Sequence, residues 1–220
     1  MEFKYELKKL LDGYEQIIGC DEVGRGCLAG PVVACAVILN SEILHHKSSI
    51  LNLKEVKDSK LMTSSQRERI APLLKEICLW SIGIVSEKEI DQINIHNASL
   101  LAMRKAVEGL CVILASEPES KLRDFHLRGS DNRYLFIDGK FLIPNFSIPQ
   151  EAVVGGDNKV MSIAAASIIA KVYRDQLMNE FDKQFVNYGF GKHKGYATLE
   201  HRNKIKKFGL TPIHRVSFCH

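Results

Sequence analysis

The sequence predicts one α/β domain in which helices flank a mixed β-sheet. Its 220 residues are 45% hydrophobic and 25% charged, proportions typical of soluble globular proteins. Short apolar runs alternate with longer segments of helical spacing, so strands and helices follow one another along the chain. No internal repeat or low-complexity tract interrupts this order, and the length suits a single domain over residues 1–220.

Two neighbouring strands are expected first. Residues 17–20 form an apolar run that ends in charge, and residues 31–39 are rich in β-branched side chains and stop at Asn40. A glycine turn joins these two runs. Helical spacing then predicts a helix over 65–77, and a third strand follows over 79–85.

The second half of the chain carries the remaining predicted elements. These are a helix, two buried strands and two helices, over residues 95–110, 134–137, 151–154, 159–185 and 199–208 in that order. The polar stretch 117–133 between them predicts a loop. Small residues at 164–167 let the longest helix pack closely against a sheet.

Composition argues against a membrane protein and a secreted protein. The longest uncharged run, between Arg25 and Glu42, contains Gly30 and Pro31 and is too interrupted for a spanning helix. The first residues carry both charge signs without a secretory apolar stretch, which predicts a cytoplasmic protein. The six cysteines form no C-x-x-C pair and are expected to be reduced core residues.

Positive charge is concentrated near the end of the chain. The whole sequence has a net charge of +4, whereas residues 192–207 alone contain six basic residues and one acidic residue. We therefore expect residues 192–220 to form a basic helical appendage to the domain. Such a segment is either a solvated helix face or a surface for an anionic partner such as nucleic acid.

Acidic residues follow two of the predicted buried strands. Asp21 and Glu22 end the first strand, and Asp138 ends the strand over 134–137. Carboxylates at the ends of adjacent strands either are simply solvated or converge into an oxygen-rich site for Mg²⁺ or Mn²⁺. Asp157, just before the longest helix, is either a fourth member of this site or a helix N-cap.

Two further motifs each allow more than one interpretation. The first motif contains Gly24, Arg25 and Gly26. It is either a structural tight turn, a place where the backbone and Arg25 contact a phosphate, or a dinucleotide-binding turn. The glycine spacing fits a dinucleotide-binding turn poorly, and a predicted strand follows instead of a helix. Tyr196, among cations, either stacks on a base or sugar or packs at a helix edge. The histidines show no zinc spacing, and no nucleophilic set stands out.

Several motifs occur in an order that resembles ribonuclease HII over about residues 15–218. They are residues 21–26 (D-E-V-G-R-G), 28–32, 58–60 (D-S-K), 137–139, 162–171 and 193–196 (H-K-G-Y), with 167–175 matching S-I-x-A-K-V-x-R-D. Any one of these motifs alone is weak evidence. Their common order is specific. Ribonuclease HIII, the nearest relative, is expected to differ after the D-E pair and to carry an extra N-terminal domain.

The resemblance implies a ribonuclease H-like fold and a function. The implied enzyme is an endonuclease that cuts the RNA strand of RNA/DNA hybrids and nicks 5′ of single ribonucleotides in duplex DNA, leaving 5′-phosphate and 3′-hydroxyl ends. Its metal-binding and catalytic carboxylates would be Asp21, Glu22, Asp138 and Asp157. The residues at 24–26 would contact the ribose 2′-OH, by which a protein distinguishes RNA from DNA.

The resemblance also implies substrate contacts and cofactors. Tyr196 would stack on the neighbouring deoxyribose, and Lys60 and Lys171 would contact phosphates. Two ions, Mg²⁺ or Mn²⁺, would activate water and stabilise the leaving oxygen. Two positions depart from the family pattern: Leu61 follows D-S-K where the family has a second lysine, and Gly156 precedes Asp157 where a lysine-glycine pair is more usual.

Two other functions are weighed against the nuclease. A non-catalytic nucleic-acid-binding module would use the basic segment 192–207 and need no metal. A nicotinamide oxidoreductase would need residues 24–30 to hold a pyrophosphate. For the nuclease, we expect a monomer that binds nucleic acid and no membrane.

Overall fold

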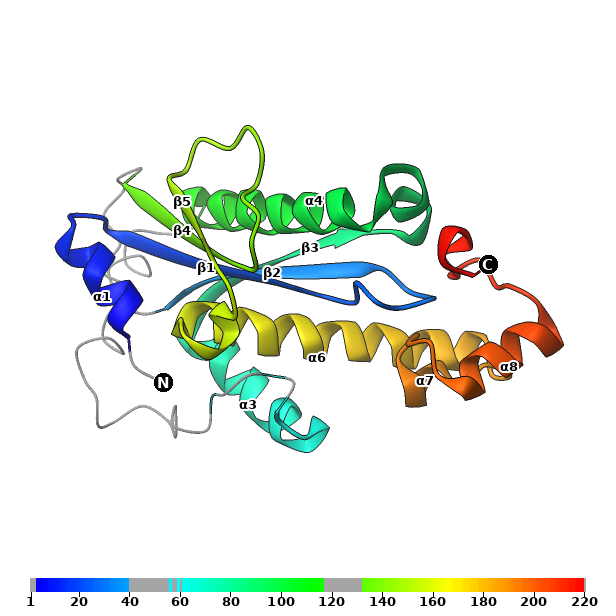
Figure 1. Cartoon of the computed structure of the whole chain (residues 1–220). Coiled ribbons are helices and arrows are strands. Elements are labelled where there is room, and N and C mark those ends of the chain that lie inside the picture. The colour runs from blue at the N-terminus through cyan, green and yellow to red at the C-terminus, as the bar shows by residue number, and fades with distance from the viewer. Residues whose placement is uncertain (1–2, 40–55, 57–58, 60, 117–131, 220) are drawn as a thin grey trace.

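The computed structural model describes residues 3–39, 56, 59, 61–116 and 132–219 (Figure 1). Its strands are β1 (Gln16–Val23), β2 (Val32–Leu39), β3 (Cys78–Val85), β4 (Arg133–Asp138) and β5 (Gln150–Val153). Its helices are α1 (Lys4–Leu11), α3 (Ser64–Ile77), α4 (Glu87–Ser116), η2 (Gly156–Asn158), α6 (Met161–Gln184), α7 (Phe190–His193), α8 (Leu199–Phe208) and η3 (Val216–Phe218). None of these helices is long and apolar enough to cross a membrane.

The five strands form one mixed sheet in the order β3-β2-β1-β4-β5. β1 pairs with β2 antiparallel, as the glycine turn predicts, and with β4 parallel. In the parallel pair Cys20 lies opposite Ile137, so the next residues, Asp21 and Asp138, lie side by side at the same end of these two strands. The predicted mixed α/β sheet is confirmed.

Helices cover both faces of this sheet (Figure 1). Ile18 and Cys20 of β1 pack with α4 on one face, and Cys35 and Val37 of β2 pack with α3 and α6 on the other. Gly19 faces α6, where an added Cβ would lie 2.3 Å from the backbone carbon of Ser162. The glycine therefore allows α6 to lie directly on the central strand, close to the edge that carries Asp21.

Three features differ from the predicted elements. Helix α1 was not predicted, and its Glu6 is buried, where one oxygen accepts from the Ser162 N–H at 2.8 Å and from the Ser162 hydroxyl. Helix α4 begins at Glu87 instead of residue 95, with a break at Asn94, where φ is 65°. Helix α7 was not predicted either. Most of the predicted loop 117–133 lies outside the described residues.

The six cysteines are free, as predicted, and four of them are buried. The C-terminal segment folds back onto the turn between β1 and β2 through isolated bridges, Cys27 with Tyr196 and Ala29 with His214. This return brings the basic segment beside the same edge of the sheet as the carboxylates.

Candidate active site

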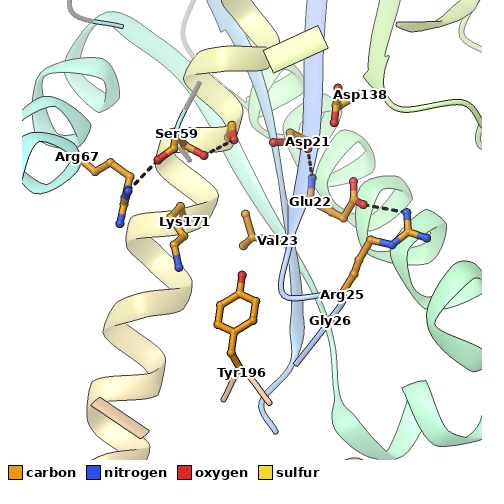
Figure 2. Close-up of a pocket in the computed structure, with 11 residues that line it drawn as sticks. Asp21, Glu22, Val23, Arg25, Gly26, Ser59, Arg67, Asp138, Lys171 and Tyr196 are labelled. Atoms are coloured by element: carbon orange, nitrogen blue, oxygen red, sulfur yellow. Dashed lines mark hydrogen bonds and ion pairs between the residues drawn. The ribbon is translucent and has the colours of Figure 1, made fainter. Parts of the chain in front are cut away.

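A cleft of about 430 Å³ opens at the edge of the sheet where β1 and β4 end (Figure 2). It brings together predicted site residues from four separate parts of the chain. Its lining consists of Asp21, Glu22, Val23, Arg25, Gly26, Ser59, Arg67, Asp138, Ser167, Lys171 and Tyr196. Figure 2 shows the three carboxylates at one end of this cleft and the Tyr196 ring at the other.

Asp21 is the most buried of the three carboxylates, with 3% of its surface exposed. One of its oxygens accepts the backbone N–H of Glu22 at 2.7 Å. Burial raises its pKa well above the ordinary value, and the charges of Glu22 and Asp138 raise it further, whereas a hydrogen bond from Ser167 acts in the opposite direction. The hydrogen bonds to Asp21 thus only partly offset the cost of a negative charge at this position.

Glu22 and Asp138 each have a partner that fixes the direction of the carboxylate. Glu22 forms an ion pair with Arg25 at 3.1 Å, which partly offsets the rise in the pKa of Glu22 caused by burial. Asp138 accepts the backbone N–H of Gly156 at 2.7 Å. This bond attaches the end of β4 to the turn before α6, which is the turn that carries Asp157.

Asp157 does not line the cleft. It is buried in η2, where its carboxylate accepts from the side-chain amide of Asn158 at 3.2 Å. The alternative in which Asp157 caps the longest helix is wrong, because the N-cap position of α6 is Val160 and Glu6 of α1 accepts the Ser162 N–H. Asp157 remains next to the cleft through its neighbour Gly156.

The candidate ligands for a divalent cation in the cleft are the carboxylates of Asp21, Glu22 and Asp138. Among the described residues, no three Asp, Glu, His or Cys side chains are arranged as they stand to hold a metal ion. Glu22 is directed to Arg25 and Asp157 to Asn158. The oxygen ligands nevertheless fit Mg²⁺ or Mn²⁺ by type. A cation beside Asp21 would relieve the repulsion among the carboxylates that raises the pKa of Asp21.

Cations and an aromatic ring form the rest of the cleft. Lys171 of α6 pairs with Asp175 at 2.7 Å, and its Nζ lies 5.6 Å from the centre of the Tyr196 ring. Tyr196 is 42% exposed, so its ring is available to a ligand in the cleft. The Asp175 carboxylate is half-buried and also lies 3.9 Å from the Arg67 guanidinium.

The three residues of the glycine turn lie differently. Gly26 and Arg25 line the cleft, but Gly24 does not. Gly24 has φ of 95°, and a Cβ there would lie 2.3 Å from Nε of Arg174, so close packing requires glycine. The dinucleotide-binding alternative is wrong, because the turn leads into strand β2 and not into a helix N-terminus.

Lys60 lies outside the described residues, and neighbouring Leu61 is exposed. The cleft also contains Arg67, Ser59 and Ser167, to which sequence reasoning assigned no role of their own. Arg67 donates to the backbone oxygen of Ser59 at 2.8 Å, and the Ser59 and Ser167 hydroxyls are 2.8 Å apart. The tertiary structure brings these residues together; Ser59 and Ser167 belong to two of the motifs quoted for the resemblance, whereas no motif of the sequence contains Arg67.

Comparisons with known proteins agree with this geometry. A family model described as ribonuclease HII matches residues 18–220. The chain is 44% identical to a ribonuclease HII of Acetivibrio thermocellus, over 97% of this chain and 73% of that protein. It is 43% identical to a ribonuclease HII of Porphyromonas gingivalis, over 96% of this chain and 93% of that protein.

Solved structures show the same fold. The ribonuclease H2 from Pyrococcus horikoshii superposes with a TM-score of 0.62 at 24% identity, covering 92% of this chain and 93% of that one. Bst-RNase HIII, solved in complex with Mn²⁺, gives a TM-score of 0.65 at 20% identity, over 92% of this chain and 67% of that one. The predicted ribonuclease H-like architecture is therefore confirmed.

Proposed function

Because the chain belongs to the ribonuclease HII family and is thus an endoribonuclease that acts on the RNA of RNA/DNA hybrids, we propose a more specific activity for it. The enzyme nicks duplex DNA on the 5′ side of a single embedded ribonucleotide. The products carry 5′-phosphate and 3′-hydroxyl ends. One observation supports this most strongly: a carboxylate cluster, the exposed residues Arg25 and Gly26 and an exposed aromatic ring line one cleft.

Each part of the cleft suits one requirement of the reaction. Hydrolysis of a phosphodiester needs a group that stabilises negative charge on the phosphate and positions the attacking water, and two divalent cations supply this when bound. Asp21, Glu22 and Asp138, with Asp157 beside them, would hold such cations, either Mg²⁺ or Mn²⁺. Lys171 would contact a backbone phosphate, since its Nζ faces the cleft beside Tyr196.

Recognition of the ribonucleotide is assigned to the other end of the cleft. An added Cβ on Gly26 would meet nothing within 4 Å, so the backbone there is open to a close approach by the sugar. We infer that the turn at 24–26 contacts the 2′-OH and that Tyr196 stacks on the adjoining deoxyribose. The basic segment 192–207 would follow the DNA backbone. Lys60 is proposed as a further phosphate contact.

We propose that the enzyme acts as a monomer. The six unpaired cysteines are consistent with the reducing conditions of the cytoplasm, where we expect the enzyme to act. No second copy and no membrane enters the mechanism.

The test uses an end-labelled DNA duplex with one ribonucleotide, an all-DNA duplex of the same sequence and a continuous RNA/DNA hybrid. Each is incubated with Mg²⁺, Mn²⁺ or EDTA. We expect one metal-dependent nick on the 5′ side of the ribonucleotide, no cleavage of the all-DNA duplex, and ends that DNA ligase and polymerase accept. Cleavage of the hybrid without any nick at the single ribonucleotide would reject the proposed specificity. Retained binding without cleavage of any substrate would favour the binding-module alternative.

A further inference from the structure

Two arginines near the cleft are completely buried, Arg174 on α6 and Arg215 in the C-terminal segment. A buried cation is costly unless its donors are satisfied, so the groups that these side chains contact are informative. In the described part of the chain, neither guanidinium forms an ion pair with a carboxylate, and Glu87 and Asp91 act on Arg215 only from longer range.

Arg215 donates to the turn that carries the proposed 2′-OH contact. Its guanidinium gives hydrogen bonds to the backbone oxygens of Gly24 at 2.7 Å, Arg25 at 2.9 Å and Gly30 at 2.7 and 3.0 Å. Its own backbone N–H donates to the Leu28 oxygen at 2.8 Å. Arg215 therefore contacts both ends of the loop 24–30 and fixes the distance between them.

Arg174 joins the same loop to the segment that carries Tyr196. It donates to the oxygens of Ala29 at 3.1 Å and Pro31 at 3.0 Å, and to the oxygen of Lys194 at 2.9 Å. Its guanidinium also packs against Gly24, where an added Cβ would lie 2.3 Å from Nε. The loop is thus held between α6 on one side and the C-terminal segment on the other.

These contacts have a specific consequence for the orientation of peptide groups. A backbone oxygen that accepts from a buried guanidinium cannot turn, and so the peptide N–H that shares its plane is fixed as well. The oxygens of Gly24 and Arg25 belong to the peptides whose N–H groups are those of Arg25 and Gly26, two residues that line the cleft. A guanidinium can hold several oxygens in one plane, which a lysine ammonium cannot do.

We propose, in an inference that rests on the proposed function, that Arg215 and Arg174 are positioning residues for ribonucleotide specificity. They hold the peptide groups at 24–26 and the Tyr196 segment in the single arrangement that accepts a ribose and disfavours a deoxyribose. Neither side chain touches the substrate, since both are covered by the loop and by the C-terminal segment, where Phe218 lies 5.3 Å from the Arg215 guanidinium.

The experiment measures selectivity separately from folding. Fluorescence anisotropy gives the Kd for a duplex with one ribonucleotide and for the matched all-DNA duplex, in Ca²⁺ to limit cleavage, and single-turnover rates are taken in Mg²⁺. The test variant is Arg215→Lys, which keeps the charge. The matched control is Asp91→Asn, which replaces one of the two oxygens that accept the Val216 and Ser217 N–H groups by an amide NH2 and so loosens the same segment without contacting the loop.

We expect the ratio of the two Kd values to fall about tenfold in Arg215→Lys, with the all-DNA Kd within about twofold of wild type. Asp91→Asn should keep the wild-type ratio. If Arg215 had a purely structural role, Arg215→Lys would lower the active fraction of enzyme for both duplexes equally. The ratio of the two Kd values would then stay unchanged, and that result would overturn the inference. An equal loss of the ratio in Asp91→Asn would overturn it too.

Arg174→Lys provides a second test if Arg215→Lys does not fold. This variant removes hydrogen bonds that hold the loop 24–30 against α6, so the ratio of the two Kd values should fall in it as well. An unchanged ratio would reject the proposal. A wild-type enzyme without any preference for the ribonucleotide duplex would refute the proposed function, and this inference with it. A wild-type preference that both lysine variants keep would refute the inference alone.

Discussion

A buried histidine pair should make the stability of this protein depend on pH. The His214 Nδ1 accepts the Thr211 N–H at 2.8 Å, so the ring proton is on Nε2 and is donated to Nε2 of His201 at 3.0 Å. His201 in turn donates from Nδ1 to the Tyr196 oxygen at 2.9 Å. Protonation of either ring would disrupt this arrangement, because two N–H groups would then face each other. His193 stacks on His201 and completes the cluster.

Burial, together with the neighbouring histidine, lowers the pKa of His214 from 6.5 to about 4. The unfolded chain therefore binds more protons than the folded protein between these two values, and stability falls as the pH decreases through this range. Between about pH 7.5 and pH 5, this one group should lower the free energy of unfolding by about 2 kcal/mol. The contribution is fully present above pH 6.5.

Urea denaturation at the two pH values measures the effect in the wild type and in His214→Gln. The glutamine amide can donate to His201 but does not titrate, so the variant should lose about 2 kcal/mol less than the wild type on acidification. His96→Gln is the matched control, since His96 lies outside this cluster against Phe141 and its replacement should preserve the wild-type difference. Parallel pH curves for wild type and His214→Gln would refute the assignment of a neutral buried pair.

Three further predictions concern the site and its support. Asp138→Asn should lower metal-dependent cleavage by about 100-fold or more with duplex binding retained, and EDTA should do the same to the wild type; binding and cleavage assays check this. Tyr196→Ala should weaken substrate binding by about 1 to 3 kcal/mol if the ring stacks, with Tyr196→Phe near wild type, as anisotropy would show. Gly19→Ala should lower the free energy of unfolding by about 1 to 3 kcal/mol, measured in urea, because its Cβ would meet the backbone of α6 at 2.3 Å.

The strands and most helices were predictable because the spacing of apolar residues along each segment shows which side chains are buried. The β2 run is buried at every position, and α8 occupies the predicted residues 199–208. Helix α1 could not be predicted in this way, because the residue that it buries is Glu6, whose carboxylate accepts hydrogen bonds at the N-terminus of α6. The start of α4 was missed for a related reason, since the break at Asn94 divides the helical pattern into two short pieces.

The carboxylates of the site were predictable to different degrees, and strand geometry explains the difference. Asp21, Glu22 and Asp138 end neighbouring strands, so pairing alone brings them to one edge. Asp157 follows a turn, and no periodic pattern determines the direction of a side chain in a turn. Its neighbour Gly156 donates its backbone N–H to the Asp138 carboxylate, a link to the cleft that spacing along the chain does not reveal.

The glycine turn shows why a motif can identify a site and still conceal how the site works. Gly24 and Gly26 belong to one motif in the sequence. In the structure, glycine is needed at the two positions for different reasons. At Gly26 the free space belongs to the cleft, whereas at Gly24 the space is filled by Arg174. Arg174 comes from a helix about 150 residues further along the chain, and the order of residues does not show that it packs against this turn. The backbone geometry of the cleft therefore depends on buried charges that only the tertiary structure places against the turn.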